Sequence, residues 1–336
     1  MRTLPTKDSE NGKAVTAGDF FEAGRDSLAL SLVTGIGHLG RVIEEPIANR
    51  PGLALSGFYE YFAEKRLQLV GYAEMAYLDS LADDVRRARF QALVDRGAFC
   101  FVYTNGLKPG APEIDVANKS GAVLLTSQLE TRVFVHDSAF VVERLRAPSA
   151  TIYGTMVEVC GLGVLFEGDP GLGKSETALG LVKHGHALVA DDLTCLRREV
   201  ANNLIFGSAS DATAGYMEIR GIGIMHVPSL FGVQAVRGEK RLDLVITFKR
   251  LEDVAEQIDR IGQTRRYRTI LGVEIPNIII PVSEGRDLVN LVETAALQQR
   301  LLQAGGNPVG ELSARLRLRA DHEALKSDIL KTKGTK

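Results

Sequence analysis

Residues 168–176 read GDPGLGKSE, and this short stretch limits what the chain can fold into. Gly168, Gly173, Lys174 and Ser175 fit the pattern G-x-x-x-x-G-K-[ST]. In that pattern the glycines let backbone N–H groups surround a polyphosphate, while the lysine and the hydroxyl meet phosphate and Mg²⁺. The loop needs a strand before it and a helix after it, because the helix N-terminus adds positive potential. The motif therefore predicts an α/β fold that binds a nucleotide.

The sequence around the loop predicts the elements that the motif needs. Residues 152–168 contain two β-rich runs broken by Gly-Leu-Gly, which favours a hairpin leading into the loop. Residues 175–184 predict an amphipathic helix, and residues 186–190 predict a short buried strand. Further along, strands are predicted at 204–207, 241–248 and 277–283, and a helix at 287–303. The alternative to a nucleotide loop is a Gly-rich strand-to-helix turn that merely contains Lys-Ser.

The first half of the chain predicts a separate mixed α/β domain. Its predicted strands are 67–71, 98–107 and 121–127, its predicted helices are 27–35, 57–66 and 131–146, and residues 50–57 predict a turn. The helix that ends near Arg146 is followed by Ala147, Pro148 and Ser149, which predict a boundary. We therefore expect an N-terminal α/β domain over 1–145, with a flexible polar leader at 1–17, and a phosphate-loop domain over 146–336 with C-terminal helices.

Composition excludes several classes of partner. Forty basic and 42 acidic residues give a net charge of −2, which offers no general attraction for nucleic acid or for an anionic membrane. Three widely spaced cysteines predict neither a disulfide framework nor a zinc site. The sequence has no segment of 18 apolar residues and no signal-peptide pattern at its start. We therefore expect a cytoplasmic protein that binds neither nucleic acid nor membranes.

Two adjacent carboxylates follow the predicted strand at 186–190. Asp191 and Asp192 lie 17 and 18 residues after Lys174, a distance that one helix and one return strand cover. They are therefore expected at the edge of the sheet that carries the loop. One carboxylate there can hold Mg²⁺ through water, and the other can accept a proton from an attacking hydroxyl group. The alternative is a surface turn with two solvated acids.

Two further segments carry candidate site residues. Glu218 and Arg220 stand next to Gly221 and Gly223 in an otherwise apolar run, as expected where the backbone approaches a ligand. A buried ion pair or a β-bulge explains that run equally well. The stretch 256–270 concentrates arginines, Arg260 among them, and a solvated face is the alternative to phosphate contact.

The chain resembles the bacterial HPr kinase/phosphorylase family, also called HPr serine kinase. GVLFEGDPGLGKSETALGLVKHGHALVADD at 163–192 is similar to the family's loop, helix and strand, and MEIRGIGIMHVPSLFG at 217–232 is similar to its signature segment. RPGLALSGFYEYFAEKRLQLVGYAE at 50–74 is similar to its N-terminal domain. Several motifs in the family's order, over most of the chain, carry the resemblance.

The resemblance implies a hexamer of two-domain subunits, whose catalytic domain is a P-loop kinase domain related to phosphoenolpyruvate carboxykinase. It implies phosphorylation by ATP of a serine on HPr, the small carrier of the sugar phosphotransferase system. It also implies the reverse phosphorolysis, in which inorganic phosphate removes the phosphoryl group as pyrophosphate. A diverged serine kinase with another protein or a small hydroxyl compound as substrate stays an alternative. So does a regulator that binds nucleotide without turnover.

The resemblance also assigns roles to residues. ATP contacts are implied for Gly168, Asp169, Pro170, Gly171, Leu172, Gly173, Lys174 and Ser175, and Mg²⁺ contacts for Ser175 and Glu218. The catalytic residues implied are Asp192, the base of the forward reaction and the acid of the reverse one, with Asp191 beside it, Lys174 and Arg260. The stretch 217–226 corresponds to one used by both activities, and 274–279 to one tied to dephosphorylation.

Two residues depart from the family pattern. Tyr153 stands where the family usually has histidine, and Pro170 stands where its loop usually has serine. A phenol titrates near pH 10 and cannot do the proton work of an imidazole near neutrality, although it can still hold a substrate by a hydrogen bond. Proline removes one N–H and a hydroxyl group near the phosphates. We therefore expect Tyr153 to weaken the reverse reaction more than the forward one.

Overall fold

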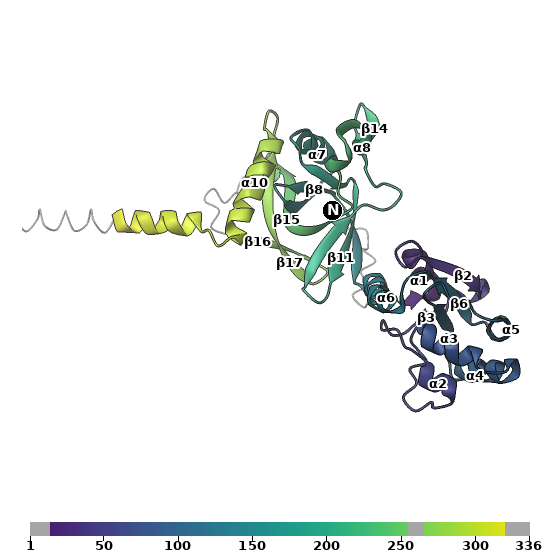
Figure 1. Ribbon diagram of the computed structural model, residues 1–336. Coiled ribbons are helices and arrows are strands. Elements are labelled where there is room, and N and C mark those ends of the chain that lie inside the picture. Colours follow the sequence, from purple (N-terminus) through teal and green to yellow (C-terminus); the bar gives the residue numbers. More distant parts are fainter. Residues whose placement is uncertain (1–13, 255–264, 320–336) are drawn as a thin grey trace, which may run out of the picture. The chain divides into compact units, whose positions relative to one another are not determined.

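A computed structural model describes residues 14–254 and 265–319. The chain divides into two compact units, of which the first ends at Pro148 and the second begins at Ser149. Figure 1 shows that each unit combines a sheet with helices. None of the helices in the described ranges has the length and apolar character that crossing a membrane requires.

The N-terminal unit is built on a four-stranded sheet in the order β2-β6-β5-β4. Its strands are β1 (Val15–Thr16), β2 (Leu30–Thr34), β3 (Val42–Ile43), β4 (Gln68–Val70), β5 (Cys100–Tyr103) and β6 (Val123–Ser127). Its helices are α1 (Ala17–Gly24), α2 (Gly52–Ser56), α3 (Tyr72–Asp79), α4 (Asp83–Asp95), α5 (Ala111–Ser120) and α6 (Thr131–Arg146), with the 3₁₀ turn η1 at Ile36–His38. Strands β4, β5 and β6 are parallel, and β2 is antiparallel to β6.

Apolar side chains alternate between the two faces of this sheet. Cys100 and Val102 of β5 pack with α1 and α6, whereas Phe101 and Tyr103 pack with α2, α4 and α5. Successive strand residues point to opposite faces, so a strand that is apolar throughout needs cover on both sides. The predicted strands at 67–71, 98–107 and 121–127 and the helix at 131–146 are confirmed.

Three local predictions for this unit are wrong. Residues 30–34 form β2 rather than a helix, because β2 completes the sheet beside β6. The predicted turn contains α2, which ends where Gly57 adopts a φ of 105°. Residues 57–66, expected as a helix, form turns. Of the leader expected to be flexible at 1–17, residues 15–17 belong to the folded unit, because Val15 is buried and Thr16 caps α1 through a hydrogen bond from Asp19 N–H.

The C-terminal unit contains a nine-stranded sheet whose main path is β10-β8-β9-β15-β12-β11-β7, with β17 on β15 and β16 on β17. The strands of this unit, including the separate β13–β14 pair, are β7 (Ser149–Tyr153), β8 (Thr155–Val159), β9 (Leu162–Gly168), β10 (Ala187–Ala190), β11 (Leu193–Glu199), β12 (Leu204–Ser208), β13 (Tyr216–Ile219), β14 (Gly223–His226), β15 (Glu239–Arg250), β16 (Arg266–Ile270) and β17 (Val273–Val282). Its helices are α7 (Lys174–Lys183), α8 (Val227–Phe231), α9 (Leu251–Val254) and α10 (Leu288–Gln303), with η2 at Val233–Ala235, and residues 308–319 are also helical.

Strand direction fixes where the site must lie. Strands β8 and β9 form the predicted antiparallel hairpin, and β10 is antiparallel to β8. Strand β10 therefore runs in the same direction as β9, and both strands end at the same edge of the sheet. The loop that follows β9 and the acids that follow β10 meet at that edge, as the sequence predicted. The predicted strands at 204–207, 241–248 and 277–283 are confirmed as β12, β15 and β17.

Helices α7 and α10 pack together on one face of this sheet. Leu181 and Val182 of α7 lie in the same core as Val292 and Ala296 of α10, and burial of each large apolar side chain contributes about 1.5–3 kcal/mol. Beyond α7, ring nitrogens of His184 and His186 lie 3.1 and 2.9 Å from Glu293 Oε1. Desolvation alone would raise the pKa of Glu293, but the hydrogen bonds from His186 and His184 lower it. The helix that begins at the loop is thus fixed at both ends.

Candidate functional site

Residues 168–175 connect β9 to α7, and we call this connection the phosphate loop. Gly168, Gly171 and Gly173 have φ values of 146°, 84° and 80°, a region that side chains rarely adopt. At Gly168 an added Cβ would also lie 2.5 Å from the carbonyl oxygen of Phe248, so glycine is required there for space as well. Asp169 and Pro170 are exposed, whereas Leu172 is buried and anchors the loop. The strand, loop and helix that the motif predicted are present.

Two cationic side chains lie at the phosphate loop. Lys174 Nζ donates to the carbonyl oxygens of Gly168 and Asp169, at 2.8 and 3.0 Å. Phosphate oxygens are stronger acceptors than these carbonyls, because a charged acceptor strengthens the hydrogen bond. Arg220 comes from the β13–β14 turn, and its Nη1 lies 3.9 Å from the position that a Cβ on Gly171 would occupy. The N-terminus of α7 adds its own positive potential at the same place.

Asp191 joins the elements of the site. Its Oδ1 accepts hydrogen bonds from Ser175 Oγ at 3.0 Å and from Thr155 Oγ1 at 2.8 Å. Its Oδ2 accepts from the backbone N–H of Glu218 at 3.1 Å. The side chain is buried, so these three donors replace the water that an ionised carboxylate needs. Asp191 therefore connects the phosphate loop, β8 and β13.

Asp192 differs from its neighbour. It is exposed, and its carboxylate makes no hydrogen bond or ion pair with any other described residue. Its backbone has a φ of 63°, and its carbonyl accepts from Gly154 N–H at 2.9 Å. An exposed carboxylate held at a fixed turn beside the loop has the accessibility that a proton acceptor needs.

Tyr153 lies next to this acidic pair. It ends β7 opposite Leu193 of β11, and 65% of the residue is exposed. The next residue, Gly154, is fixed through both of its backbone polar groups. Its carbonyl oxygen accepts from Thr194 Oγ1 at 2.8 Å, and its N–H donates to the carbonyl oxygen of Asp192. Tyr153 is therefore held beside Asp192 by backbone contacts.

Ser175 and Glu218 fit Mg²⁺ by their chemistry. Ser175 Oγ keeps lone pairs after donating to Asp191, and the carboxylate of Glu218 is exposed on the neighbouring hairpin. Mg²⁺ takes hard oxygen ligands and is usually held by one or two protein groups together with substrate phosphates. Among the residues described, no group of three or more His, Cys, Asp or Glu side chains is arranged for a metal, so nucleotide phosphates would have to complete the coordination.

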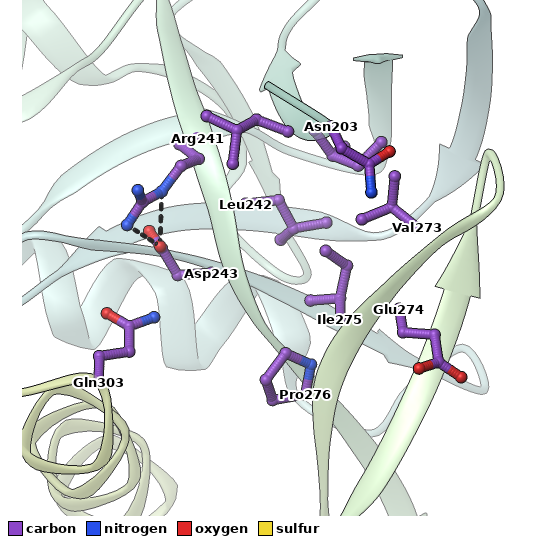
Figure 2. Close-up of a pocket in the computed structure, with 11 residues that line it drawn as sticks. Asn203, Arg241, Leu242, Asp243, Val273, Glu274, Ile275, Pro276 and Gln303 are labelled. Atoms are coloured by element: carbon purple, nitrogen blue, oxygen red, sulfur yellow. Dashed lines mark hydrogen bonds and ion pairs between the residues drawn. The ribbon is translucent and has the colours of Figure 1, made fainter. Parts of the chain in front are cut away.

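Two predicted parts of the site need separate comment. Arg260 lies outside the described residues. The stretch 274–279 lies in β17, whose first half borders a cavity of about 550 Å³. Figure 2 shows that cavity, with Arg241 and Asp243 paired at one side and Val273 to Pro276 at the other. The cavity is at the start of β15, whereas Phe248 near the end of β15 lies beside Gly168, so this cavity is not the phosphate site.

Sequence reasoning missed two threonines. Thr155 and Thr194 are fully buried, and each donates its hydroxyl within the site, to Asp191 and to Gly154. A signal was available, because a hydroxyl group in an apolar strand needs a buried partner. Each threonine also stands within two residues of a predicted site residue.

Fold and site together define a class of protein: a two-unit α/β protein with a glycine loop for a nucleotide and an accessible carboxylate beside it. Comparison with known families narrows this class. The HPr Serine kinase C-terminal domain matches residues 144–316, and the HPr Serine kinase N terminus matches residues 15–139. The chain therefore belongs to the HPr serine kinase family.

Two curated relatives agree with this assignment. A curated relative from Leptospira biflexa, named HPr kinase/phosphorylase, is 38% identical over 307 residues, which are 91% of this chain and 95% of that protein. One of the same name from Caldicellulosiruptor bescii is 41% identical over 277 residues, 82% and 88% of the two chains. A solved Hpr(Ser) kinase/phosphatase from Coxiella burnetii is 37% identical, with a TM-score of 0.44 over 46% of this chain and 93% of that one. The resemblance seen in the sequence is confirmed, and membership of a kinase family implies the use of ATP.

Proposed function

We propose that this protein transfers the γ-phosphoryl group of ATP to a serine of HPr, the small carrier of the sugar phosphotransferase system. One observation carries the proposal: an accessible carboxylate, Asp192, stands beside Asp191, whose own carboxylate accepts a hydrogen bond from Ser175 in the phosphate loop. A loop for ATP beside a proton acceptor is what a kinase needs. The relatives named HPr kinase/phosphorylase supply the identity of the acceptor.

The proposed forward reaction assigns one task to each group. The loop amides and Lys174 bind the phosphates, and the Lys174 ammonium leaves the two loop carbonyls to do so. Asp192 takes the proton of the serine hydroxyl while the serine oxygen bonds to the γ-phosphorus and the bond to the ADP oxygen breaks. Mg²⁺ on Ser175 and Glu218 would neutralise phosphate charge, and Arg260 is assigned a catalytic role by the resemblance alone.

The reverse reaction follows from the same groups. Inorganic phosphate would attack the phosphorus of phosphoserine, pyrophosphate would form, and protonated Asp192 would return its proton to the serine oxygen. We propose that Tyr153 makes this direction the slower one, because a phenol has no second ring nitrogen with which to accept and pass on a proton as an imidazole does. Pro170 adds to the effect, because it offers the incoming phosphate no N–H.

The central experiment measures transfer of label from γ-labelled ATP to purified HPr. We expect the wild-type protein to label HPr on serine, and Lys174→Ala to reduce the rate by about 10²–10³-fold because a phosphate clamp is lost. Lys183→Ala is the matched control, since it removes an exposed lysine from the other end of the same helix. No transfer to HPr by the wild-type protein, with ATP binding retained, would reject HPr as the substrate and leave a serine kinase with another substrate or a nucleotide-binding regulator.

A second experiment tests the direction of the reaction. Phosphorylated HPr is incubated with inorganic phosphate and Mg²⁺, and pyrophosphate release is compared with the forward rate. We expect the wild-type protein to release pyrophosphate more slowly than it phosphorylates HPr, and Tyr153→His to narrow that difference. Equal rates in the wild-type protein would contradict the role given to Tyr153.

We also propose a cytoplasmic homohexamer, on the resemblance alone. Light scattering coupled to size-exclusion chromatography measures the assembly directly. A mass of one or two subunits at working concentration would reject the hexamer without affecting the proposed chemistry.

A further inference from the structure

The β13–β14 hairpin has two different faces. Its antiparallel register pairs Met217 with Met225 and Glu218 with Ile224. Met217 and Ile219 are buried in the core, and Met225 packs against that core. Because strand residues alternate between faces, Glu218 and Ile224 share the outward face.

The outward face exposes large apolar groups beside the phosphate loop. Ile224 is 77% exposed, and Ile222 in the turn is 69% exposed. Within the described ranges, β13 and β14 pair only with each other. Single exposed apolar residues are common, but two isoleucines two residues apart at the end of one hairpin form an apolar edge, which favours an interaction. We call Ile222 and Ile224 the isoleucine edge.

The isoleucine edge adjoins the proposed centre of phosphoryl transfer. Backbone N–H of Glu218 donates to Asp191, and Asp192 is the next residue along the chain. Residues directly opposite in an antiparallel pair have Cβ atoms about 4.5–5.5 Å apart, so Ile224 is an immediate neighbour of Glu218. Arg220, between the two strands, reaches the phosphate loop at Gly171. A protein that brings a serine to Asp192 must therefore approach this edge.

We infer that the isoleucine edge is a docking surface for the protein substrate, and that it receives an exposed apolar side chain next to the acceptor serine. This inference rests on the proposed function. A small hydroxyl compound could be phosphorylated without contacting Ile222 or Ile224, whereas a folded protein must cover surface around the reacting group. The edge thus contributes to protein recognition while the loop and the acids carry out transfer.

The test separates recognition from chemistry in the double variant Ile222→Ser/Ile224→Thr. Threonine keeps the β-branched shape that suits a strand and removes part of the apolar surface. We expect KM for HPr to rise about tenfold, the effect of losing about 1.4 kcal/mol of docking energy. The rise in KM for HPr should exceed both the change in KM for ATP and any fall in kcat at saturating HPr, because a docking contact contributes to binding of the protein before the transition state as well as in it.

The matched control is Ile36→Ser. Ile36 is 78% exposed and lies in η1 of the N-terminal unit, so the substitution removes an equally exposed isoleucine elsewhere. An unchanged KM for HPr in the double variant overturns the inference, as does an equal rise in the control. A parallel rise in KM for ATP also overturns it, because the hairpin would then act on the nucleotide. Failure of the wild-type protein to label HPr is a different result, which rejects the proposed function itself.

A double-mutant cycle tests the contact from the other side. Exposed apolar residues next to the acceptor serine of HPr are changed to serine one at a time, and each HPr variant is assayed with wild-type and double-variant kinase. Non-additive effects on kcat/KM at one position support direct contact. Additive effects at every such position overturn it.

Discussion

In both units polar residues follow the ends of sheet strands, but the N-terminal unit pairs their side chains with one another, whereas the C-terminal unit leaves one of them exposed. In the N-terminal unit, Thr131 Oγ1 contacts Thr104 Oγ1 at 2.6 Å and accepts from Asn105 Nδ2 at 2.8 Å. In the C-terminal unit, Asp192 follows β10, and its side chain is exposed and makes no hydrogen bond or ion pair with another described residue. Polar strand ends alone therefore do not mark a site.

The contrast extends to charged groups. Arg86 of the N-terminal unit donates to Glu113 and to Asp79, and Glu113 is fully buried. Desolvation alone would lower the pKa of Arg86, but the hydrogen bond from its guanidinium to Glu113 raises it. In the C-terminal unit the only partners of Lys174 among the described residues are two carbonyl groups, which a ligand can replace. Groups with permanent partners stabilise a fold, whereas groups left without them remain available for chemistry.

The largest expected effect separates the two adjacent acids. Asp192→Asn should lower kcat for HPr phosphorylation by about 10²–10⁴-fold, because the amide cannot accept the serine proton. Its free energy of unfolding should change by less than about 0.5 kcal/mol, since the side chain is exposed. Single-turnover transfer and urea unfolding measure the two quantities.

Asp191→Asn serves as the comparison for that prediction. An amide cannot accept all three hydrogen bonds that the carboxylate accepts, so about 1–3 kcal/mol of stability should be lost together with activity. Equal stability of the two variants would remove the distinction between a buried positioning acid and an accessible proton acceptor.

The next largest effect is a loss of stability that is confined to the N-terminal unit. Glu113→Ala should lower its stability by about 3–5 kcal/mol, because Arg86 would be left buried without its main partner. Hydrogen exchange of peptides within residues 14–148 measures the loss. Below the unfolding temperature the KM for ATP should stay unchanged. The double substitution Arg86→Met/Glu113→Leu is the control, since removing both charges should restore much of the stability.

A smaller effect is expected at Thr155, whose hydrogen bond contributes to both stability and activity. Thr155→Val keeps the shape of the side chain and removes the hydrogen bond to Asp191, so the unit should lose about 1.5–3 kcal/mol. Because Asp191 also holds Ser175, we expect the Mg²⁺ concentration for half-maximal activity to rise. Loss of stability with an unchanged Mg²⁺ requirement would make Thr155 purely structural.

The sequence predicted the C-terminal unit better than the N-terminal one, for physical reasons. A phosphate loop requires a strand before it and a helix after it, which predicted the hairpin and α7. The number of residues between Lys174 and the acidic pair then predicted β10 and the place of the two acids. Residues 30–34 carry no such constraint, and their pairing with β6 depends on contacts nearly 100 residues away, which local pattern does not encode. The hydroxyls of Thr155 and Thr194 donate to Asp191 and Gly154, which lie 36 and 40 residues away. The sequence therefore signals only that each hydroxyl needs a buried partner, and the fold shows which partner it has.

The smallest effect concerns a buried thiol with no assigned role. Burial raises the pKa of Cys100 to about 12 from 9.0, with Arg41 acting weakly in the opposite sense. Above pH 9 the unfolded chain loses this proton while the folded chain keeps it, so stability falls as pH rises towards 12. At pH 9.5 the loss should be about 1 kcal/mol relative to pH 7.5. Cys100→Ala and Cys100→Ser should both remove this part of the pH dependence, whatever their effect at pH 7.5.

A subtilisin pulse across a urea series, with peptides of residues 14–148 identified by mass spectrometry, measures the stability of the N-terminal unit at each pH. Identical pH dependence in wild type and both variants would show that the buried thiol ionises without cost, and the N-terminal unit would then be less tightly closed than its contacts indicate.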